Sequence, residues 1–194
     1  MKKRLAVFAS GSGSDFQSVI DAVERGEINA SIAVLVASKP DIGAVERAAR
    51  HGISVAVYQK KDYADPAAMF AAISAFLRTL FVDYIVLAGY LTILTPNIVR
   101  DYRDRIVNIH PSLIPKYCGD GFYGIRVHRA ALENGEAYSG ATVHLVDEGT
   151  DTGRILAQER VPILPDDTPE TLQARVLALE HTLLPRTLAA LCAE

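Results

Sequence analysis

Short apolar runs alternate with longer segments of helical periodicity in the first half of the chain. The apolar runs cover residues 5–9, 32–37, 55–58, 84–88 and 106–109. Between them, residues 14–25, 41–51 and 66–80 carry apolar side chains at helical spacing, which predicts three amphipathic helices. Residues 85–88 are apolar at every position, as in strands that are buried on both faces. The alternation predicts right-handed βαβ crossovers and a mostly parallel, Rossmann-like open sheet with helices on both faces.

The second half of the chain has a different pattern. Residues 139–146 and 154–163 are two extended segments joined by an acidic, glycine-containing loop, which predicts an antiparallel pair at the sheet edge. Thr168-Pro169-Glu170 combines a hydroxyl cap, a proline at the first helical position and an acid in the first turn, so we expect a C-terminal helix to begin there. We see no internal repeat or linker, and we expect residues 1–194 to form one α/β domain.

Composition and charge narrow the class of protein. Of the 194 residues, 49% are hydrophobic and 22% are charged, as in ordinary globular domains. A formal net charge of −3 argues against nucleic acid or an anionic membrane as the main partner. No apolar run approaches the ~20 residues of a membrane span, and the apolar stretch behind the basic N-terminus is too short for a secretory leader. Cys118 and Cys192 do not make a disulfide framework, so we expect a cytoplasmic protein.

A glycine turn follows the first predicted strand. Ser10-Gly11-Ser12-Gly13-Ser14-Asp15 leads into a helix, where unpaired N–H groups and the helix dipole favour an anion. The glycine spacing differs from that of dinucleotide-binding turns and P-loops, which favours a single phosphate group. The alternative is a tight turn in which Ser14 or Asp15 caps the helix. The Asp15 carboxylate would repel a phosphate unless its side chain points away.

The fifth predicted strand ends in a polar motif. Period-2 geometry puts the side chains of Asn108 and His110 on the same side, and Pro111 forces the chain out of the sheet directly afterwards. Ligands of open parallel sheets bind beyond the carboxyl ends of the strands. An amide and an imidazole together suit acyl-type chemistry, because both can stabilise an oxyanion and histidine can move protons. The alternative is a strand-end histidine that is bonded to a backbone carbonyl.

The acidic loop at 147–153 could supply a third group. A carboxylate of Asp147 or Asp151 could orient the histidine and favour its charged form, and the spacing does not choose between the two. The alternative is a solvated turn. We expect no metal, because the five histidines are dispersed and the chain has neither His-Glu-x-x-His nor paired Cys-x-x-Cys.

Together these motifs resemble those of the phosphoribosylglycinamide formyltransferases, the folate-dependent glycinamide ribonucleotide transformylases of purine synthesis. The resemblance covers essentially the whole chain. The stretches that carry it are Ser10–Ser14, Leu87–Leu91, Asn108–Tyr117, Gly140–His144 and Asp151–Gly153. It implies direct transfer of the formyl group of 10-formyltetrahydrofolate, a co-substrate, to the amine of glycinamide ribonucleotide, with no bound cofactor.

The resemblance also implies roles for individual residues. His110 would stabilise the oxyanion and protonate the departing folate nitrogen, Asn108 would bind the formyl oxygen, and Asp151 would orient His110. The ribonucleotide would be bound by Gly13, Ser14, Asp15 and Glu180. The folate pocket would be formed by Leu91, Thr92, Ile93, Leu94, Asn108, Asp147, Glu148, Gly149, Thr150 and Asp151. The half up to about residue 105 would hold the ribonucleotide, and residues 106–194 would hold the folate and the catalytic groups.

Some positions depart from the family pattern. The family often has Asn in place of Asp15 and Arg in place of Thr92, some members have Arg near Pro66, and residues 118–124 read as a longer loop close to the site, a candidate lid. Other possibilities are a formyltetrahydrofolate deformylase, a methionyl-tRNA formyltransferase, a non-catalytic binder and a nicotinamide-dependent oxidoreductase. We expect two small-molecule substrates as the partners, and a monomer or homodimer.

Overall fold

The computed structural model describes residues 2–193, and its seven strands within that range form one sheet. The strands are β1 (Lys3–Ala9), β2 (Ala30–Ala37), β3 (Val55–Val57), β4 (Tyr84–Leu87), β5 (Ile106–His110), β6 (Tyr138–Leu145) and β7 (Ile155–Pro162). Their order is β3-β2-β1-β4-β5-β6-β7. The first five pair in parallel, whereas β6 pairs antiparallel with both β5 and β7. The predicted parallel sheet with an antiparallel edge is confirmed.

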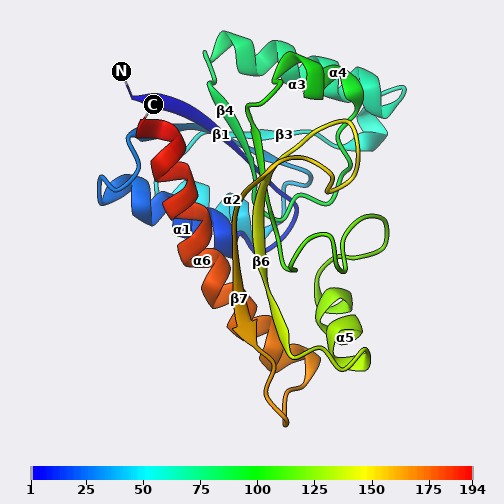
Figure 1. The fold of residues 1–194 in the computed structure, drawn as a ribbon. Coiled ribbons are helices and arrows are strands. Elements are labelled where there is room, and N and C mark those ends of the chain that lie inside the picture. The colour runs from blue at the N-terminus through cyan, green and yellow to red at the C-terminus, as the bar shows by residue number, and fades with distance from the viewer. Residues whose placement is uncertain (1, 194) are drawn as a thin grey trace.

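Helices cover both faces of this sheet (Figure 1). They are α1 (Ser14–Glu24), α2 (Gly43–Arg50), α3 (Pro66–Thr79), α4 (Pro96–Asp101), α5 (Ile125–Glu133) and α6 (Pro169–Ala193), with a short 3₁₀ turn at Lys60–Asp62. Residues of α1, α2 and α6 pack in one hydrophobic core, and residues of α3 and α4 pack in a second core. Strand β1 serves both cores, since Leu5 and Val7 belong to the first and Ala6 and Phe8 to the second. A strand buried on both faces explains its uninterrupted apolar run.

Two helices, α4 and α5, are absent from the sequence prediction. Helix α4 has six residues and buries only Ile98 and Val99. Helix α5 has nine residues and buries Val127, His128 and Ala131. A six-residue helix such as α4 does not repeat an apolar stripe often enough to be recognised by periodicity, and the buried positions of α5 include a histidine, which does not count as apolar.

The C-terminal helix begins where the sequence predicts. The Thr171 N–H donates to Thr168 Oγ1 at 3.3 Å, as expected for a hydroxyl cap. By length and composition α6 could cross a membrane, a test that core helices also pass. Its side chains Leu172, Val176 and Leu183 are fully buried in the core shared with α1 and α2. Helix α6 is therefore a packing element of this domain.

The carboxyl ends of β1, β4 and β5 meet at one edge of the sheet. The Ser10 N–H donates to the Gly89 carbonyl at 3.1 Å, and Ser10 Oγ accepts from the Leu91 N–H at 3.1 Å. These bonds join the turn after β1 to the loop after β4. The loop after β5 leaves the same edge at Pro111, so three loops frame one region.

Candidate active site

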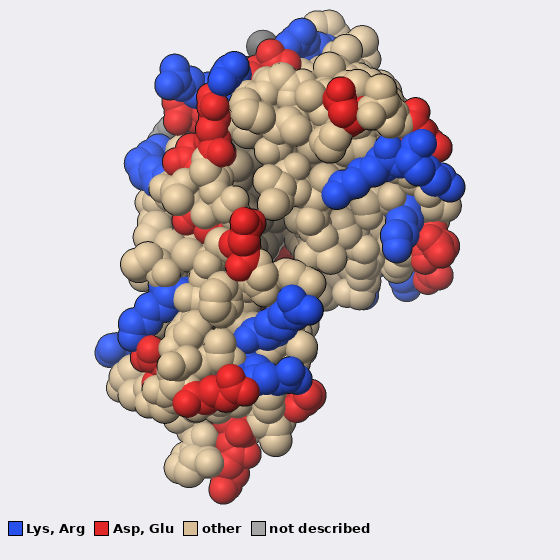
Figure 2. Space-filling model, turned by 90° about the vertical axis from the view of Figure 1, so that its right-hand side faces the viewer, with Lys and Arg blue, Asp and Glu red and all other residues tan. Residues whose placement is uncertain are grey.

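A cavity of about 640 Å³ lies at this edge of the sheet. It is lined by every residue predicted to be catalytic or to bind the ribonucleotide: Gly13, Ser14, Asp15, Asn108, His110, Asp151 and Glu180. The space-filling view shows a hollow near the middle of one face, with Lys and Arg interspersed with Asp and Glu around it (Figure 2). The structure thus brings together residues from α1, β5, α6 and the loop between β6 and β7.

His110 lies at the centre of the polar groups and is only 6% exposed. Its Nε2 lies 2.9 Å from the Tyr117 carbonyl oxygen, and because a carbonyl can only accept, Nε2 carries the proton. Nδ1 lies 3.7 Å from Asp151 Oδ2. Burial lowers the pKa of His110, and the Tyr117 carbonyl and the Asp151 charge oppose this effect without cancelling it. The ring is therefore neutral near pH 7, with Nδ1 free to accept a proton.

Asp151 is held in a costly backbone conformation. Its φ is 57°, and the φ of Tyr117 is 51°, so the residues that face the two ring nitrogens of His110 both lie in the left-handed region. The Asp151 Oδ2 accepts from the Gly119 N–H at 2.9 Å. Burial acts to raise the pKa of Asp151, but contact with His144, the Gly119 N–H and the charge of His110 bring it below the ordinary value. The carboxylate is ionised and faces two imidazoles.

Asp147, in the same loop, has a structural role. Its Oδ1 accepts from the Gly149 N–H at 3.0 Å and from Thr152 Oγ1 at 2.6 Å, which fixes the shape of the turn. A side chain at Gly153 would place its Cβ 1.8 Å from the Leu145 carbonyl oxygen, so the return of the loop requires glycine there. Of the two acids that the spacing leaves open, Asp151 lies beside His110.

Asn108 is oriented by a histidine that the sequence analysis did not single out. Asn108 and His144 are direct partners across the β5–β6 ladder, and Asn108 Nδ2 donates to His144 Nε2 at 3.1 Å. His144 Nδ1 in turn donates to the Leu145 carbonyl at 2.8 Å. This pairing fixes which side of the amide is the donor and leaves one Nδ2 hydrogen for a ligand. His144 Nε2 also lies 3.5 Å from Asp151 Oδ1.

The glycine turn is open to a ligand. Gly13 is the N-cap of α1 with a φ of 74°, and no side chain caps the helix. The capping alternative for Ser14 and Asp15 is therefore wrong. A Cβ on Gly13 would come within 2.8 Å of Ala44, so both the backbone conformation and the contact with α2 require glycine. The amide groups of the first turn are left without a side-chain acceptor.

Two carboxyl groups meet at the other end of the cavity. Asp15 Oδ1 is buried without a hydrogen-bond partner, 3.7 Å from His181 Nε2, which also has none. Burial raises the pKa of Asp15 to about 6. Burial, followed by the charge of Asp15, raises the pKa of Glu180 well above its ordinary value. The Asp15 side chain is only 13% exposed, and Asp15 still lines the cavity.

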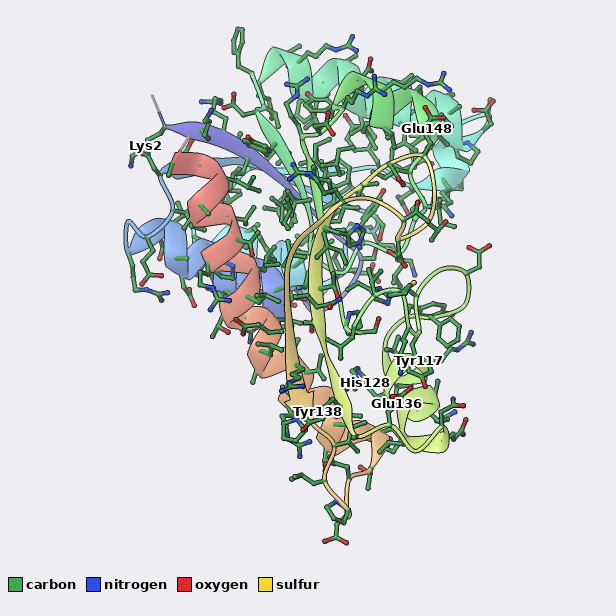
Figure 3. The ribbon with its side chains drawn as sticks, viewed as in Figure 1. Lys2, Tyr117, His128, Glu136, Tyr138 and Glu148 are labelled. Atoms are coloured by element: carbon green, nitrogen blue, oxygen red, sulfur yellow. The ribbon has the colours of Figure 1, made fainter. Side chains whose placement is uncertain are left out.

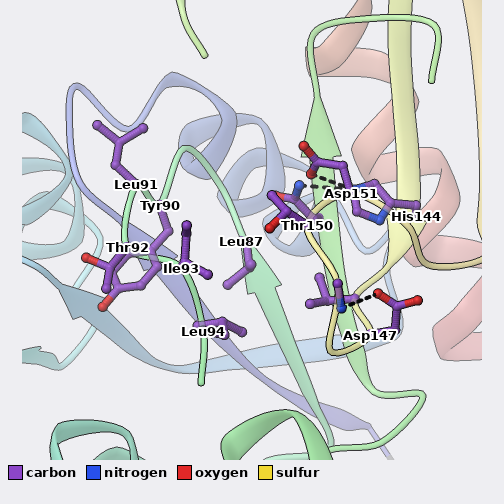
Figure 4. Close-up of a pocket in the computed structure, with 13 residues that line it drawn as sticks. Leu87, Tyr90, Leu91, Thr92, Ile93, Leu94, His144, Asp147, Thr150 and Asp151 are labelled. Atoms are coloured by element: carbon purple, nitrogen blue, oxygen red, sulfur yellow. Dashed lines mark hydrogen bonds and ion pairs between the residues drawn. The ribbon is translucent and has the colours of Figure 1, made fainter. Parts of the chain in front are cut away.

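A smaller cavity of about 120 Å³ adjoins the first one (Figure 4). Its lining includes Leu91, Thr92, Ile93, Leu94, Asn108, Asp147, Gly149, Thr150 and Asp151, nearly the whole predicted folate set. Asn108 and Asp151 line both cavities, so the two meet at the catalytic candidates. Glu148 is the exception, because it does not line this cavity and pairs with Arg100 of α4 at 2.8 Å (Figure 3). Both cavities draw residues from the two halves of the chain.

His128 is a second residue that sequence reasoning missed. It lies on α5 at 1% exposure, lines the larger cavity, and has no hydrogen-bond partner at Nδ1. Burial, with a further contribution from the charge of His110, lowers its pKa to about 4. His144 could have been found from its place opposite Asn108 once β5 and β6 were paired. No local signal pointed to His128.

Two other positions of the sequence analysis, Pro66 and Cys118, have ordinary surroundings. Pro66 opens α3 behind Asp65, whose Oδ1 accepts from the Ala68 N–H at 2.8 Å, and it lines neither cavity. Cys118, in the loop before α5, donates to the Pro115 carbonyl at 3.3 Å, and burial raises its pKa. Among residues 2–193, no group of three or more His, Cys, Asp or Glu side chains could hold a metal ion.

Comparisons with known proteins place this fold in a family. The chain belongs to the formyl transferase family, whose sequence model matches residues 3–188. It is 43% identical to the chloroplastic phosphoribosylglycinamide formyltransferase of Arabidopsis thaliana over all of this chain and 66% of that protein, and 40% identical to the Haemophilus influenzae enzyme over 94% of this chain and 84% of that one. The solved glycinamide ribonucleotide transformylase 1 of Geobacillus kaustophilus superposes with a TM-score of 0.93 at 42% identity, over 99% of this chain and 100% of that one. The chain thus spans just under two thirds of the plant relative.

Proposed function

We propose that this protein transfers the formyl group of 10-formyltetrahydrofolate to the amine of glycinamide ribonucleotide in purine synthesis. The observation that carries the proposal is the meeting of Asn108, His110 and Asp151 where two cavities join. A reaction between two separately bound substrates needs such a junction. The names of the relatives at 40–43% identity point to the same reaction.

The chemistry begins with attack of the uncharged amine on the formyl carbon. The carbonyl oxygen becomes an oxyanion, which accepts the free Nδ2 hydrogen of Asn108. The attacking nitrogen loses a proton to Nδ1 of His110, directly or through water, and the Asp151 carboxylate 3.7 Å away stabilises the imidazolium. The C–N bond to the folate then breaks, and His110 returns a proton to the departing nitrogen. His110 thus takes one proton from the amine and returns one proton to the folate nitrogen, so it ends the reaction unchanged.

The two cavities suit the two small-molecule substrates. The larger one has the amides of Gly13, Ser14 and Asp15 for a phosphate, and the Glu180 carboxyl for ribose hydroxyls. The smaller one, with Leu91–Leu94 on one side and the Asp147–Asp151 loop on the other, suits the flat folate ring. Cys118 and Cys192 are free thiols, which suits a reducing compartment such as the cytoplasm.

A steady-state assay with both substrates tests the proposal. Wild-type protein should form formylglycinamide ribonucleotide, and His110→Ala should lose this turnover while keeping its melting temperature. His51→Ala is the matched control for kcat, because His51 does not line either cavity and contacts Gln17 and Glu24 instead. Release of formate without transfer would indicate a deformylase, and tight binding without turnover would indicate a non-catalytic binder. Either result would refute the proposal.

A further inference from the structure

The glycine turn does not hold its shape by itself. Two of its carbonyl groups are bound by α2, a helix that lines neither cavity. The Ala44 N–H donates to the Gly11 carbonyl at 3.1 Å, and Arg47 Nε donates to the Ser12 carbonyl at 2.9 Å. Because a trans peptide N–H points opposite to the carbonyl of the same peptide group, the N–H groups of Ser12 and Gly13 point away from α2, and both residues line the cavity.

Steric contacts between the same two elements allow little adjustment. A Cβ on Gly43 would lie 2.9 Å from the Ser12 carbonyl oxygen, and one on Gly13 would lie 2.8 Å from Ala44. The first turn of α2 therefore packs directly against the glycine turn. A change in either element would move the other.

Arg47 is anchored on a second side. Its Nη1 donates to Gln17 Oε1 on α1 at 3.1 Å, and Gln17 Nε2 donates to Asp21 Oδ1 at 2.8 Å. The guanidinium thus connects α2, the turn and α1. Its planar array of donors suits this double task, which a lysine ammonium on a flexible stem meets less well.

We infer that Arg47 is a positioning residue for the anion site: it holds the Ser12 carbonyl so that the amides of Gly13, Ser14 and Asp15 bind the substrate phosphate. This inference rests on the proposed function, since it assigns the phosphate of the ribonucleotide to that turn. Arg47 contacts no reacting atom, so its loss should affect binding of the phosphorylated substrate and spare the chemical step.

The test compares Arg47→Met and Arg47→Lys with wild type on two substrates, glycinamide ribonucleotide and its riboside lacking the phosphate. Arg47→Met should raise KM for the ribonucleotide about tenfold or more, the loss expected when donors to a charged group are misplaced. kcat, KM for the folate and kcat/KM for the riboside should stay within about twofold. Arg47→Lys should recover part of the loss, because it keeps one donor for the Ser12 carbonyl.

Arg50→Met is the matched control. Arg50 lies on the same helix, and its Nε donates only to the Glu46 carbonyl within α2. It should behave as wild type on both substrates. If Arg47→Met does not fold, Gln17→Leu removes the second anchor of Arg47 and should raise KM for the ribonucleotide, by less, with the same sparing of the riboside.

Two results would overturn the inference: an unchanged KM for the ribonucleotide in Arg47→Met, or an equal loss for the ribonucleotide and the riboside. The second would mean that Arg47 supports the fold alone. Failure of the proposed function is distinguishable, because it would appear as absent turnover in wild type. Calorimetric binding of ribose 5-phosphate to wild type and to Arg47→Met would then decide the claim about Arg47, since weaker binding to the variant supports it and equal binding refutes it.

Discussion

The two ends of the larger cavity differ in how completely their polar atoms are paired. Around His110, the ring nitrogen Nε2, the Asn108 amide and the Asp151 carboxylate each have a partner within 3.1 Å, and the exception among the buried imidazoles there is Nδ1 of His128. Around Asp15, one carboxylate oxygen and His181 Nε2 have none. The first end is arranged before any ligand binds, as electrostatic stabilisation of a transition state requires. The second end keeps two buried acids close together, a repulsion that ligand donors would relieve.

The largest expected effect on the His110 end of the cavity comes from removing the charge of Asp151, which orients the His110 ring. Asp151→Asn should lower kcat by roughly 10²–10⁴-fold, because a neutral amide no longer stabilises the imidazolium form of His110. Its melting temperature should change little. Asp166→Asn is the control, since Asp166 is exposed and lines neither cavity. Rapid-quench or steady-state kinetics that find Asp151→Asn within tenfold of wild type would contradict the assigned role.

At the other end of the cavity, where Asp15 and Glu180 lie, a substitution of Asp15 should change the stability of the protein rather than its turnover. Because burial raises the pKa of Asp15 from 3.8 to about 6, the folded state binds more protons than the unfolded state across that range, and stability falls as the pH rises through it. Asp15→Asn removes this loss, so it should stabilise the protein by up to about 3 kcal/mol near pH 7.5 and by almost nothing near pH 4. KM for the ribonucleotide should stay the same or fall.

Urea unfolding of wild type and Asp15→Asn at the two pH values measures the effect. An equal gain at both would show that the amide packs better than the acid and that the cost of burying the Asp15 charge is not involved. A loss of stability near pH 7.5 together with a raised KM would mean that the Asp15 carboxylate assists binding.

A substitution of His144, which pairs with Asn108, should have a smaller effect on the His110 end of the cavity. His144→Leu removes the acceptor that orients the amide, so kcat should fall about 10–30-fold, in keeping with one misdirected hydrogen bond in the transition state. His144→Gln can supply an acceptor again and should recover part of the loss. Thermal melting of both variants controls for packing, because His144 is 1% exposed. Equal activity of the two variants would exclude the orienting role.

The sequence predicts the sheet and its central helices well, because strands such as β1 and β4 are buried on both faces and have strong local patterns. Asn108 and His110 could be found from alternation along one strand. The sequence does not show that Asp151 rather than Asp147 lies beside His110, since this depends on the shape of the turn that Asp147 and Gly153 impose. His144 and His128 reach the cavities only through strand pairing and the packing of α5, which are properties of the whole fold.

The smallest expected effect concerns the one predicted folate residue that lies outside the pocket. Arg100 Nε and Nη2 donate to the two oxygens of Glu148 at 2.8 and 3.1 Å, which ties the loop after β6 to α4. Both side chains are largely exposed, so water and salt screen the pair. Arg100→Ala should therefore raise KM for the folate by no more than about twofold and leave KM for the ribonucleotide and kcat unchanged. Glu148→Gln should match it, because either change releases the same tether. A larger rise in Glu148→Gln than in Arg100→Ala would show that the Glu148 carboxylate turns inward to contact the folate itself, as the family resemblance implies.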